Sequence, residues 1–418
     1  MSNLRHWLWL STRGPAPGMY AARLLEHFGT PEGAYFASEA AYDQVPDLPS
    51  KVRRALLDKD LTGADRILAQ CDALDIRILT CQDAAYPQRL AQLDTAPCVL
   101  YVRGKLPQID QEAAVAVVGA RKASPYGVMA AGRMALDLAR HGAVVVSGSA
   151  YGIDGAALRG ALQGGGRVVS VLGNGIDVVY PPGHRDLYED VAAHGALVSE
   201  YPPGTPPNGP HFPVRNRLIA GLSLGVLVVE GTQSSGSLIT AKWALEQGRD
   251  VFAVPGGIDN PASAGTNQLI RDGAILATNG WDVMREYTGL FPGQVRYQPG
   301  GQNLDLTPEQ LRSAAPEQPA KPAPEEKSGR DTPPLEEKAI DNGENKPYIE
   351  LDTILPQVEG DEKALVLQLA DKPQTADELI EKTQLPAARV MASLTLLEVQ
   401  GIVQCGRDKR FSLVSTRQ

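Results

Sequence analysis

Cysteine is scarce in this sequence, and its few cysteines form no recognisable pattern. The four residues Cys71, Cys81, Cys98 and Cys405 are scattered, with no C-x-x-C pair. Zinc sites and disulfide frameworks need closely spaced cysteines, so the sequence predicts no metal, no cofactor and no disulfide framework. Unpaired cysteines are typical of a reducing compartment, which favours the cytoplasm.

Long apolar runs are also missing. No stretch approaches the roughly 20 apolar residues that a membrane-spanning helix needs. The segment from Met1 to Leu10 contains Arg5 but no apolar core of signal-peptide length. We therefore expect a soluble intracellular protein without a membrane partner.

An excess of positive charge is absent as well. The chain has 40 basic and 49 acidic residues, a formal net charge of −9. This balance argues against a uniformly basic nucleic-acid binder. The acids are concentrated, however, because ten acids and six bases lie between Asp305 and Lys346. Any nucleic-acid site must therefore be a local patch elsewhere in the chain.

The composition changes along the chain and predicts four regions. Residues 1–75 indicate short helices around tight turns, a small domain similar to helix-hairpin-helix or sterile-alpha-motif modules. Leu48-Pro49 stands where such a hairpin usually has its phosphate-binding glycine, so we favour a packing role for this domain. Residues 291–349 are rich in Pro and Glu and predict a flexible linker. Residues 350–418 indicate a second compact domain.

Residues 76–290 alternate between apolar strand patterns and helix patterns. Ala114–Val118, for example, is a continuous apolar run, and a helix pattern follows over Tyr126–His141. Repeated strand–helix units predict an α/β fold with a Rossmann-like, doubly wound and mostly parallel sheet. Ligands of such sheets bind outside the carboxyl ends of the strands.

The C-terminal region has the pattern of a winged helix. Thr375-Ala376-Asp377-Glu378 has capping-box spacing, and a longer helix is expected from Pro386 to Gln400. Two short strands, Ile402–Cys405 and Arg410–Val414, are expected to form the wing. The presumed recognition helix carries Arg389 but few other polar side chains that could read bases. Duplex DNA and a protein therefore remain equal alternatives as its partner.

Several predicted strands end in small or polar loops, which should meet on one rim of the sheet. These loops are Gly119-Ala120-Arg121, Ser147-Gly148-Ser149, Gly173-Asn174-Gly175 and Gly231–Gly236. Backbone N–H groups in such turns can approach an anion. Neither the dinucleotide motif G-x-G-x-x-G nor an ATP-binding P-loop occurs at these turns. Several shallow anion sites along one rim favour an extended polyanion over a compact cofactor.

The run Phe212-Pro213-Val214-Arg215-Asn216-Arg217 adds two arginines and an aromatic ring to this rim. Guanidinium groups can grip phosphate oxygens, and a base could stack on Phe212. We expect Arg215 and Arg217 to form one wall of a groove, on a loop before a helix that begins at Arg217, with Arg121 opposite. The alternative is that Glu200 or Glu230 pairs with one of these arginines.

Evidence for catalysis is weak. Glu200 and Glu230 close two strands and could act as a general acid–base pair, but a structural ion pair is the favoured interpretation. Asp154 is expected only to cap a helix. No nucleophile motif surrounds His184 or His211.

The order and spacing of these motifs resemble the DNA processing protein A (DprA, or Smf) family. The resemblance rests on segments between about residues 110 and 275, namely 118–127, 147–154, 171–182, 212–223, 235–241, 254–256 and 265–270. It implies a single-stranded DNA-binding protein of natural transformation, not an enzyme. Members of this family protect incoming DNA, load the RecA recombinase onto it, and form homodimers through the Rossmann-like domain.

The loops and the resemblance together predict a set of DNA-binding residues. By position, Arg121, Phe212, Arg215 and Arg217 match the contact residues that the family implies. The full predicted set is Gly119, Arg121, Lys122, Ser124, Ser147, Gly148, Tyr151, Gly173, Asn174, Phe212, Arg215, Asn216, Arg217, Ser235 and Gly236.

Two positions depart from the family pattern. Leu158 stands where members usually have a histidine, and Tyr151 stands where many have a basic or small residue. An alternative function is a nucleotide phosphoribohydrolase of the lysine-decarboxylase-like group. Its P-G-G-x-G-T-x-x-E motif is interrupted here, with Leu269 in place of the catalytic glutamate. A third alternative is a regulator that acts on DNA through the winged helix.

Overall fold

The computed structural model describes residues 2–14, 18 and 20–299, and eight separate segments between residues 360 and 413. These segments are 360–370, 373–383, 385–386, 389–390, 393–394, 397–398, 402–405 and 410–413. Contacts divide the chain into two compact units, Met1–Pro322 and Ala323–Gln418. The expected linker over 291–349 lies largely outside the described residues.

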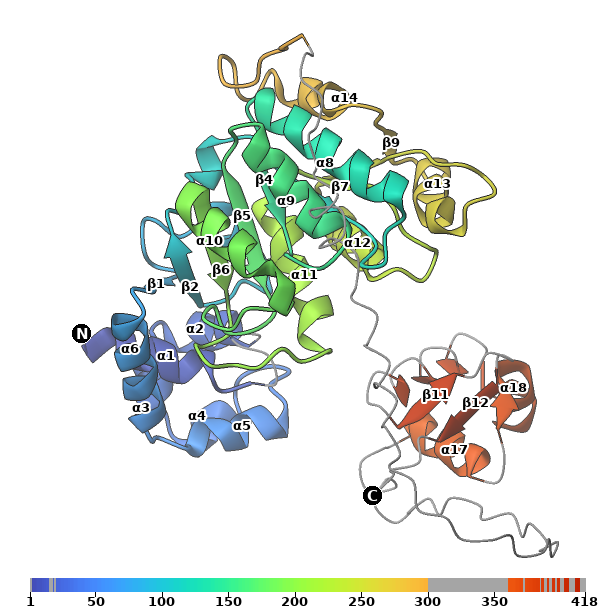
Figure 1. Cartoon of the computed structure of the whole chain (residues 1–418). Helices are drawn as coiled ribbons and strands as arrows, with labels where there is room; N and C mark the ends of the chain where they lie inside the picture. Colours follow the sequence, from blue (N-terminus) through green and yellow to red (C-terminus); the bar gives the residue numbers. More distant parts are fainter. Residues whose placement is uncertain are drawn as a thin grey trace, which may run out of the picture. The chain divides into compact units, whose positions relative to one another are not determined.

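A nine-stranded sheet forms the centre of the first unit (Figure 1). Its order is β1-β2-β6-β5-β4-β3-β7-β8-β9. In this order, the seven strands from β6 across to β9 pair in parallel, and the β1–β2 and β2–β6 pairs at one edge are antiparallel. The expected mostly parallel sheet is thus confirmed. The strands are β1 (Arg77–Thr80), β2 (Val99–Gly104), β3 (Ala114–Val118), β4 (Val144–Ser147), β5 (Val168–Leu172), β6 (Gly195–Ser199), β7 (Gly225–Val228), β8 (Asp250–Ala253) and β9 (Ile275–Leu276).

Helices cover both faces of this sheet, which explains why its central strands are apolar without alternation. In β3, Val115 and Val117 join one core cluster, whereas Ala114, Ala116 and Val118 join the other. The first cluster includes residues of α8 (Pro125–Arg140), α9 (Ile153–Gln163), α10 (Arg185–His194) and α14 (Gly280–Met284). The second includes residues of α7 (Gln88–Ala91), α11 (His211–Leu222) and α12 (Gly236–Glu246).

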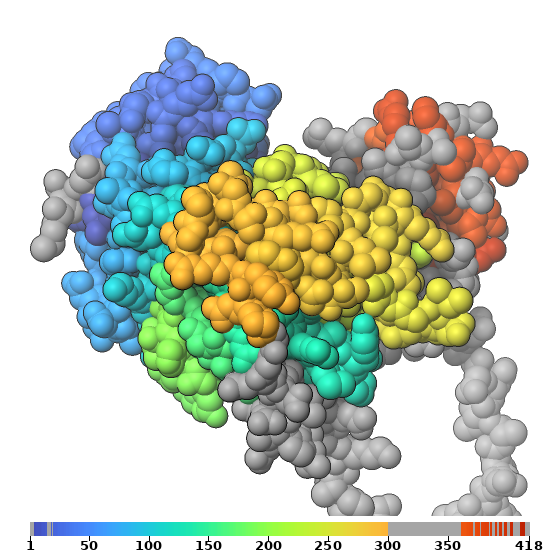
Figure 2. Space-filling view, turned by 90° about the horizontal axis from the view of Figure 1, so that it is seen from above, coloured from blue at the N-terminus to red at the C-terminus, as the bar shows by residue number. Residues whose placement is uncertain are grey.

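Short helices at the N-terminus pack beside the β1–β2 edge of the sheet (Figures 1 and 2). They are α1 (Ser2–Ser11), α2 (Ala21–Phe28), α3 (Pro31–Phe36), α4 (Glu39–Tyr42), α5 (Ser50–Leu57) and α6 (Thr62–Ala73). The Thr30 side chain caps α3 by accepting the Gly33 N–H. The core is continuous from Trp7 and Trp9 into the sheet. A domain boundary near residue 75 stays a prediction.

The second unit contains a three-stranded sheet and helices α17 (Gly360–Leu369) and α18 (Ala376–Thr383). Its strands are β10 (Gln374–Thr375), β11 (Val403–Cys405) and β12 (Arg410–Leu413). The predicted capping box is confirmed, because Thr375 N–H donates to Glu378 and Glu378 N–H donates to the Thr375 hydroxyl. The expected helix over 386–400 lies partly outside the described residues.

The remaining helix, α13 (Ala264–Arg271), and four 3₁₀ turns connect these elements. The turns are η1 (Ile109–Gln111), η2 (Pro182–His184), η3 (Pro261–Ser263) and η4 (Arg285–Tyr287). In the part of the chain that the structure describes, we find no helix with the length and hydropathy of a membrane span.

The connections of β3 and β7 create a crevice at one end of the sheet. These two strands are parallel neighbours, but the chain continues from β3 to α8 on one face and from β7 to α12 on the other. Loops that leave towards opposite faces open a crevice at the carboxyl ends of the strands, where ligands of such sheets bind. The loops 119–124 and 229–235 border this crevice.

Candidate nucleic-acid interface

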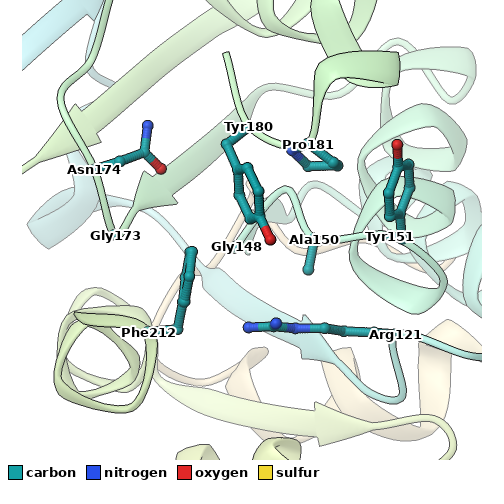
Figure 3. Close-up of a pocket in the computed structure, with 9 residues that line it drawn as sticks. All are labelled: Arg121, Gly148, Ala150, Tyr151, Gly173, Asn174, Tyr180, Pro181 and Phe212. Atoms are coloured by element: carbon teal, nitrogen blue, oxygen red, sulfur yellow. The ribbon is translucent and has the colours of Figure 1, made fainter. Parts of the chain in front are cut away.

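Two adjoining depressions lie at the carboxyl ends of the strands. We call the larger one the groove. It has a cavity volume of about 380 Å³ and is lined mainly by the loop after β3, the start of α11 and the start of α12. The smaller one, which we call the slot, is shallow, with a cavity volume of about 30 Å³ (Figure 3). Both are lined by Arg121, Ala150 and Phe212, so they form one continuous surface.

The motif 212–217 lies within α11 and not on a loop, so the expected helix start at Arg217 is wrong. The helix begins at His211. Pro213 is compatible with this position, because a proline in the first helical turn leaves no N–H bond broken and has a helical φ. The helix places Phe212 and Asn216 along the groove.

Arg215 lines the groove although it is only 3% exposed. Its Nη1 donates to the carbonyl of Gly148 at 2.9 Å and to that of Val171. A side chain at Gly148 would clash, since a Cβ there would lie 2.7 Å from both Arg215 Nη2 and Asp154 Oδ2. The glycine in the β4 loop is therefore needed to let these two charged groups approach the backbone.

Asp154 and Arg215 are both buried, and burial shifts each pKa in the direction that favours the neutral form of the side chain. Burial raises the pKa of the Asp154 carboxyl, an effect that the nearby Arg215 and Arg121 guanidinium groups oppose. Burial likewise lowers the pKa of Arg215, and Asp154 opposes that shift. Asp154 is the one acidic residue among those that line the groove.

Arg217 has a different environment, and the expectation that it faces the groove is wrong. Its guanidinium forms a two-pronged ion pair with Glu200, at 3.0 and 2.6 Å. Both side chains are almost fully buried. Arg217 lines neither the groove nor the slot. The alternative of an Arg217–Glu200 pair is therefore confirmed.

Glu230 is buried and holds the loop after β3. Its carboxylate accepts the Ser124 N–H at 2.7 Å and the Ser124 hydroxyl at 2.5 Å. The Ser124 hydroxyl in turn caps α8 by accepting the Gly127 N–H. Ser147 is also buried and donates to the Val117 carbonyl. Ser124 and Ser147 thus hold the rim in shape and line neither depression.

Aromatic rings and one guanidinium frame the slot (Figure 3). The rings of Tyr180 and Phe212 are stacked, with centroids 5.4 Å apart and an interplanar angle of 28°. The Arg121 guanidinium lies 4.8 Å from the centroid of Phe212. Gly173 leaves room for the Phe212 ring, because a Cβ at this position would lie only 2.9 Å from a ring carbon.

Tyr151 and Asn174 complete the slot. The Tyr151 ring packs edge-on against His184, at a centroid distance of 5.1 Å. The Asn174 amide donates to the Gly175 and Val178 carbonyls, which holds the β5 loop.

Leu158 is fully buried in the core. The unusual leucine is therefore a packing residue in this chain.

Two cations on the loop after β3 are available to a ligand. Arg121 and Lys122 are exposed, and neither has an ion-pair partner within the described ranges. Phosphate groups attract such cations, and the N–H groups at the start of α12 also point toward an anion. A polyanion with flat apolar rings matches both the groove and the slot.

Most residues of the predicted set come together at this surface. Those that line the groove or the slot are Gly119, Arg121, Lys122, Gly148, Tyr151, Gly173, Asn174, Phe212, Arg215, Asn216, Ser235 and Gly236. Tyr180 and Pro181 were missed by the sequence prediction, as was the placement of Asp154 in the groove. A tyrosine followed by two prolines, shortly after a glycine-ended strand, was the available signal for Tyr180.

Known proteins resemble this chain over both units. The model of the family described as DNA recombination-mediator protein A matches residues 77–288, and that of the DprA winged helix domain matches residues 351–408. Protein Smf of Synechocystis sp. is 36% identical over 285 residues, 66% of this chain and 71% of that protein. DNA processing protein DprA of Streptococcus pneumoniae is 44% identical over 205 residues, 49% of this chain and 72% of that protein.

A solved structure agrees with this relationship. The X-ray structure of DNA processing protein A from Streptococcus pneumoniae is 34% identical, with a TM-score of 0.58. It covers 67% of this chain and 96% of the solved chain. The resemblance seen in the motifs is thus confirmed, and the C-terminal unit is a winged helix. Because the family model spans the whole sheet, and Protein Smf of Synechocystis sp. is matched over 71% of its length, the chain belongs to the DNA recombination-mediator protein A family.

Proposed function

We propose that this protein binds single-stranded DNA in the groove and the slot as a recombination mediator. The observation that carries the proposal is the position of Arg121, a cation that forms no ion pair with any described residue and borders both the polar groove and the aromatic slot. A nucleotide has a charged phosphate and a flat apolar base, and this surface offers a counterpart to each. Arg121 and Lys122 bind the phosphates, and Phe212 and Tyr180 hold a base.

A single strand fits this chemistry better than a duplex. Bases in a duplex are stacked on one another, so their faces cannot reach Phe212 or Tyr180. Stacking on aromatic side chains is tolerant of base identity, since every base has an apolar face. Phosphate contacts are equally independent of sequence. We therefore expect binding with little sequence preference and a strong dependence on salt.

We further propose that the protein protects DNA that enters the cell during natural transformation and loads the RecA recombinase onto it. The family description supports a mediator role, because a mediator must hold a strand and pass it to a recombinase. Homodimerisation through the sheet unit would let two grooves act on one strand. The free thiols of Cys71, Cys81 and Cys98 support a cytoplasmic location.

We propose binding without catalysis. The residues that line the groove include a single carboxyl, that of Asp154, whereas general acid–base work usually pairs two groups with different pKa values. Leu269 packs against the core, at the position of the glutamate that the phosphoribohydrolase alternative requires.

Fluorescence anisotropy with a labelled oligothymidylate and a labelled duplex of equal length tests the binding proposal. We expect tighter binding of the single strand. Arg121→Gln should weaken it about 10- to 100-fold and lower the slope of log affinity against log salt by about 1. Arg66→Gln is the matched control, since Arg66 is an exposed arginine on α6 without an ion pair. Equal binding of duplex, or an unchanged Arg121→Gln variant, contradicts the proposal.

RecA loading and dimerisation need separate measurements. Stimulation of the ATPase activity of RecA on single strands coated with a binding protein tests loading, and no stimulation refutes it. Light scattering of the free protein tests the dimer, and a monomer mass at micromolar concentration refutes it.

A further inference from the structure

A second hollow lies beyond the groove, on the surface of α8. It has a cavity volume of about 260 Å³ and lies between α8 and the segment after β8. Its lining includes Tyr126, Met129, Arg133 and Pro255. We call it the α8 hollow. It shares no residue with the groove or the slot, so the proposed function does not yet use it.

The groove and the α8 hollow are neighbours along the chain. Lys122 lines the groove, and Tyr126 lines the hollow four residues later, at the start of α8. The Tyr126 hydroxyl donates to the Pro255 carbonyl at 3.2 Å, while its ring remains 49% exposed. Tyr126 also borders a shallow open area with Gly256 and Asn260. An exposed aromatic face thus lies only four residues along the chain from the lining of the groove.

The residues of the hollow repeat the chemistry of the groove. Tyr126, Met129 and Arg133 are spaced by three and four residues, so they share one face of α8. Tyr126 and Met129 are exposed apolar side chains, and Arg133 is an exposed cation. Seven residues at a rise of 1.5 Å separate the ring from the cation by about 10 Å along the helix. A stacking surface is followed by a charge, as expected for successive nucleotides.

The charge of Arg133 is available to a ligand. It has no ion-pair partner in the described part of the chain, and the residues that line the hollow include no carboxylate. The nearest acid along the helix is Asp137, whose carboxylate accepts the Gly280 N–H at 2.7 Å and lies beside His141. Asp137 lies one helical turn beyond Arg133, but Gly280 and His141 engage its carboxylate, and no ion pair joins it to Arg133 in the described part of the chain.

We propose that the α8 hollow is a second subsite for the same single strand, occupied by about two nucleotides that leave the groove past Lys122. A base lies on Tyr126 and Met129, and its phosphate contacts Arg133. This inference rests on the proposed function, because it extends that binding surface. It makes the affinity depend on strand length, since a short oligonucleotide fills only the groove and the slot.

A length series tests the subsite. Affinities for oligothymidylates of about 5 and about 15 nucleotides are measured for the natural chain and for Arg133→Gln. We expect Arg133→Gln to weaken the long oligonucleotide about tenfold and to leave the short one unchanged. Tyr126→Ala should act in the same way, whereas Tyr126→Phe keeps the ring and should bind like the natural chain. Arg66→Gln is the control for a lost surface charge.

The possible results separate this inference from the proposed function. If the natural chain binds neither oligonucleotide, the proposed function itself fails. If Arg133→Gln and Tyr126→Ala bind both lengths normally, only the second subsite is refuted. Equal losses at both lengths also refute it, because they place Arg133 in the main site or in folding. A change in the mass of the free protein without a change in length dependence assigns the hollow to contact between copies and overturns the proposal.

Discussion

The groove and the winged-helix unit both carry arginines, but Arg121 of the groove differs from Arg389 and Arg410 in having no carboxylate in an ion pair with it among the described residues. In the groove, Arg121 is exposed and without a carboxylate partner in the described part of the chain. In the winged-helix unit, Arg389 forms two hydrogen bonds with Asp361, at 2.7 and 2.8 Å. Arg410 pairs with Glu378 at 3.2 Å. The presence of arginine therefore does not locate a phosphate site, and the pairing state of each arginine is more informative.

This difference has a simple electrostatic reason. A phosphate that binds an unpaired guanidinium gains a new charge-assisted hydrogen bond. A phosphate that binds Arg389 must first displace Asp361, so the net gain is small. The difference favours the groove as the main DNA site.

Arg217→Ala removes a paired arginine from the sheet unit and should have the largest effect of these variants, a loss of folding stability. Loss of this guanidinium leaves Glu200 charged and buried, which should lower the free energy of unfolding by about 3–5 kcal/mol. Chemical denaturation measures it. Arg121→Ala should change stability by less than about 0.5 kcal/mol, because its side chain is exposed. A Glu200→Leu/Arg217→Met double variant should recover most of the loss, and equal stability of Arg217→Ala contradicts the buried pair.

Phe212→Ala tests whether the slot holds a base. Removing a stacking ring should cost about 1–3 kcal/mol of single-strand affinity, or roughly 5- to 150-fold. Fluorescence anisotropy gives the affinity, and Phe212→Tyr, which keeps the ring, is the control. Phe36→Ala removes an exposed ring that is remote from the groove. If Phe212→Ala binds normally while Arg121→Gln does not, the slot is not a base site.

Asp154 should make binding depend on pH. Burial raises its pKa above the ordinary value, and a phosphate in the groove favours its neutral form further. Affinity should thus be greatest below this pKa and fall as pH rises through it, because the ionised carboxylate repels phosphate. Its contribution to stability follows the same sign and is lost as pH rises through the folded-state pKa. Asp154→Asn should flatten both profiles, and identical profiles would argue against this role.

Variants of the winged helix should have the smallest effect. Arg389→Ala and Arg410→Ala break exposed ion pairs, which contribute about 0–1 kcal/mol to stability. We expect single-strand affinity to change less than about twofold in either variant. Anisotropy measures this alongside Arg121→Gln. A loss in these variants as large as that of Arg121→Gln would reverse the contrast between the two units.

Much of the fold follows from local patterns. The apolar run Ala114–Val118 coincides with β3, because a strand buried on both faces needs no alternation. The helix predicted over Tyr126–His141 corresponds to α8, Pro125–Arg140. The glycine-ended strands meet at one rim because parallel strands bring their carboxyl ends together. These features depend on periodicity and strand direction, which a single sequence carries.

The motif 212–217 shows where local patterns are insufficient. A proline and two arginines suggest a loop, yet the segment is the first half of α11. On a helix, residues two apart point about 200° from each other, so Arg215 and Arg217 cannot share one wall. The half-buried ring of Tyr180 was missed for a related reason, since its stacking partner Phe212 is distant in sequence.

The sequence alone was sufficient for the parallel sheet, the winged helix and the rim of glycine-rich loops, because these depend on residues close together in the chain. Only the tertiary structure decided which cations face a ligand. Glu200 follows β6 and Arg217 lies on α11, and their pairing depends on how a strand and a helix pack. Arg121 remains available because, among the described residues, packing brings no carboxylate into an ion pair with it. Burial and pairing are properties of the assembled fold, so they determine the role of each arginine.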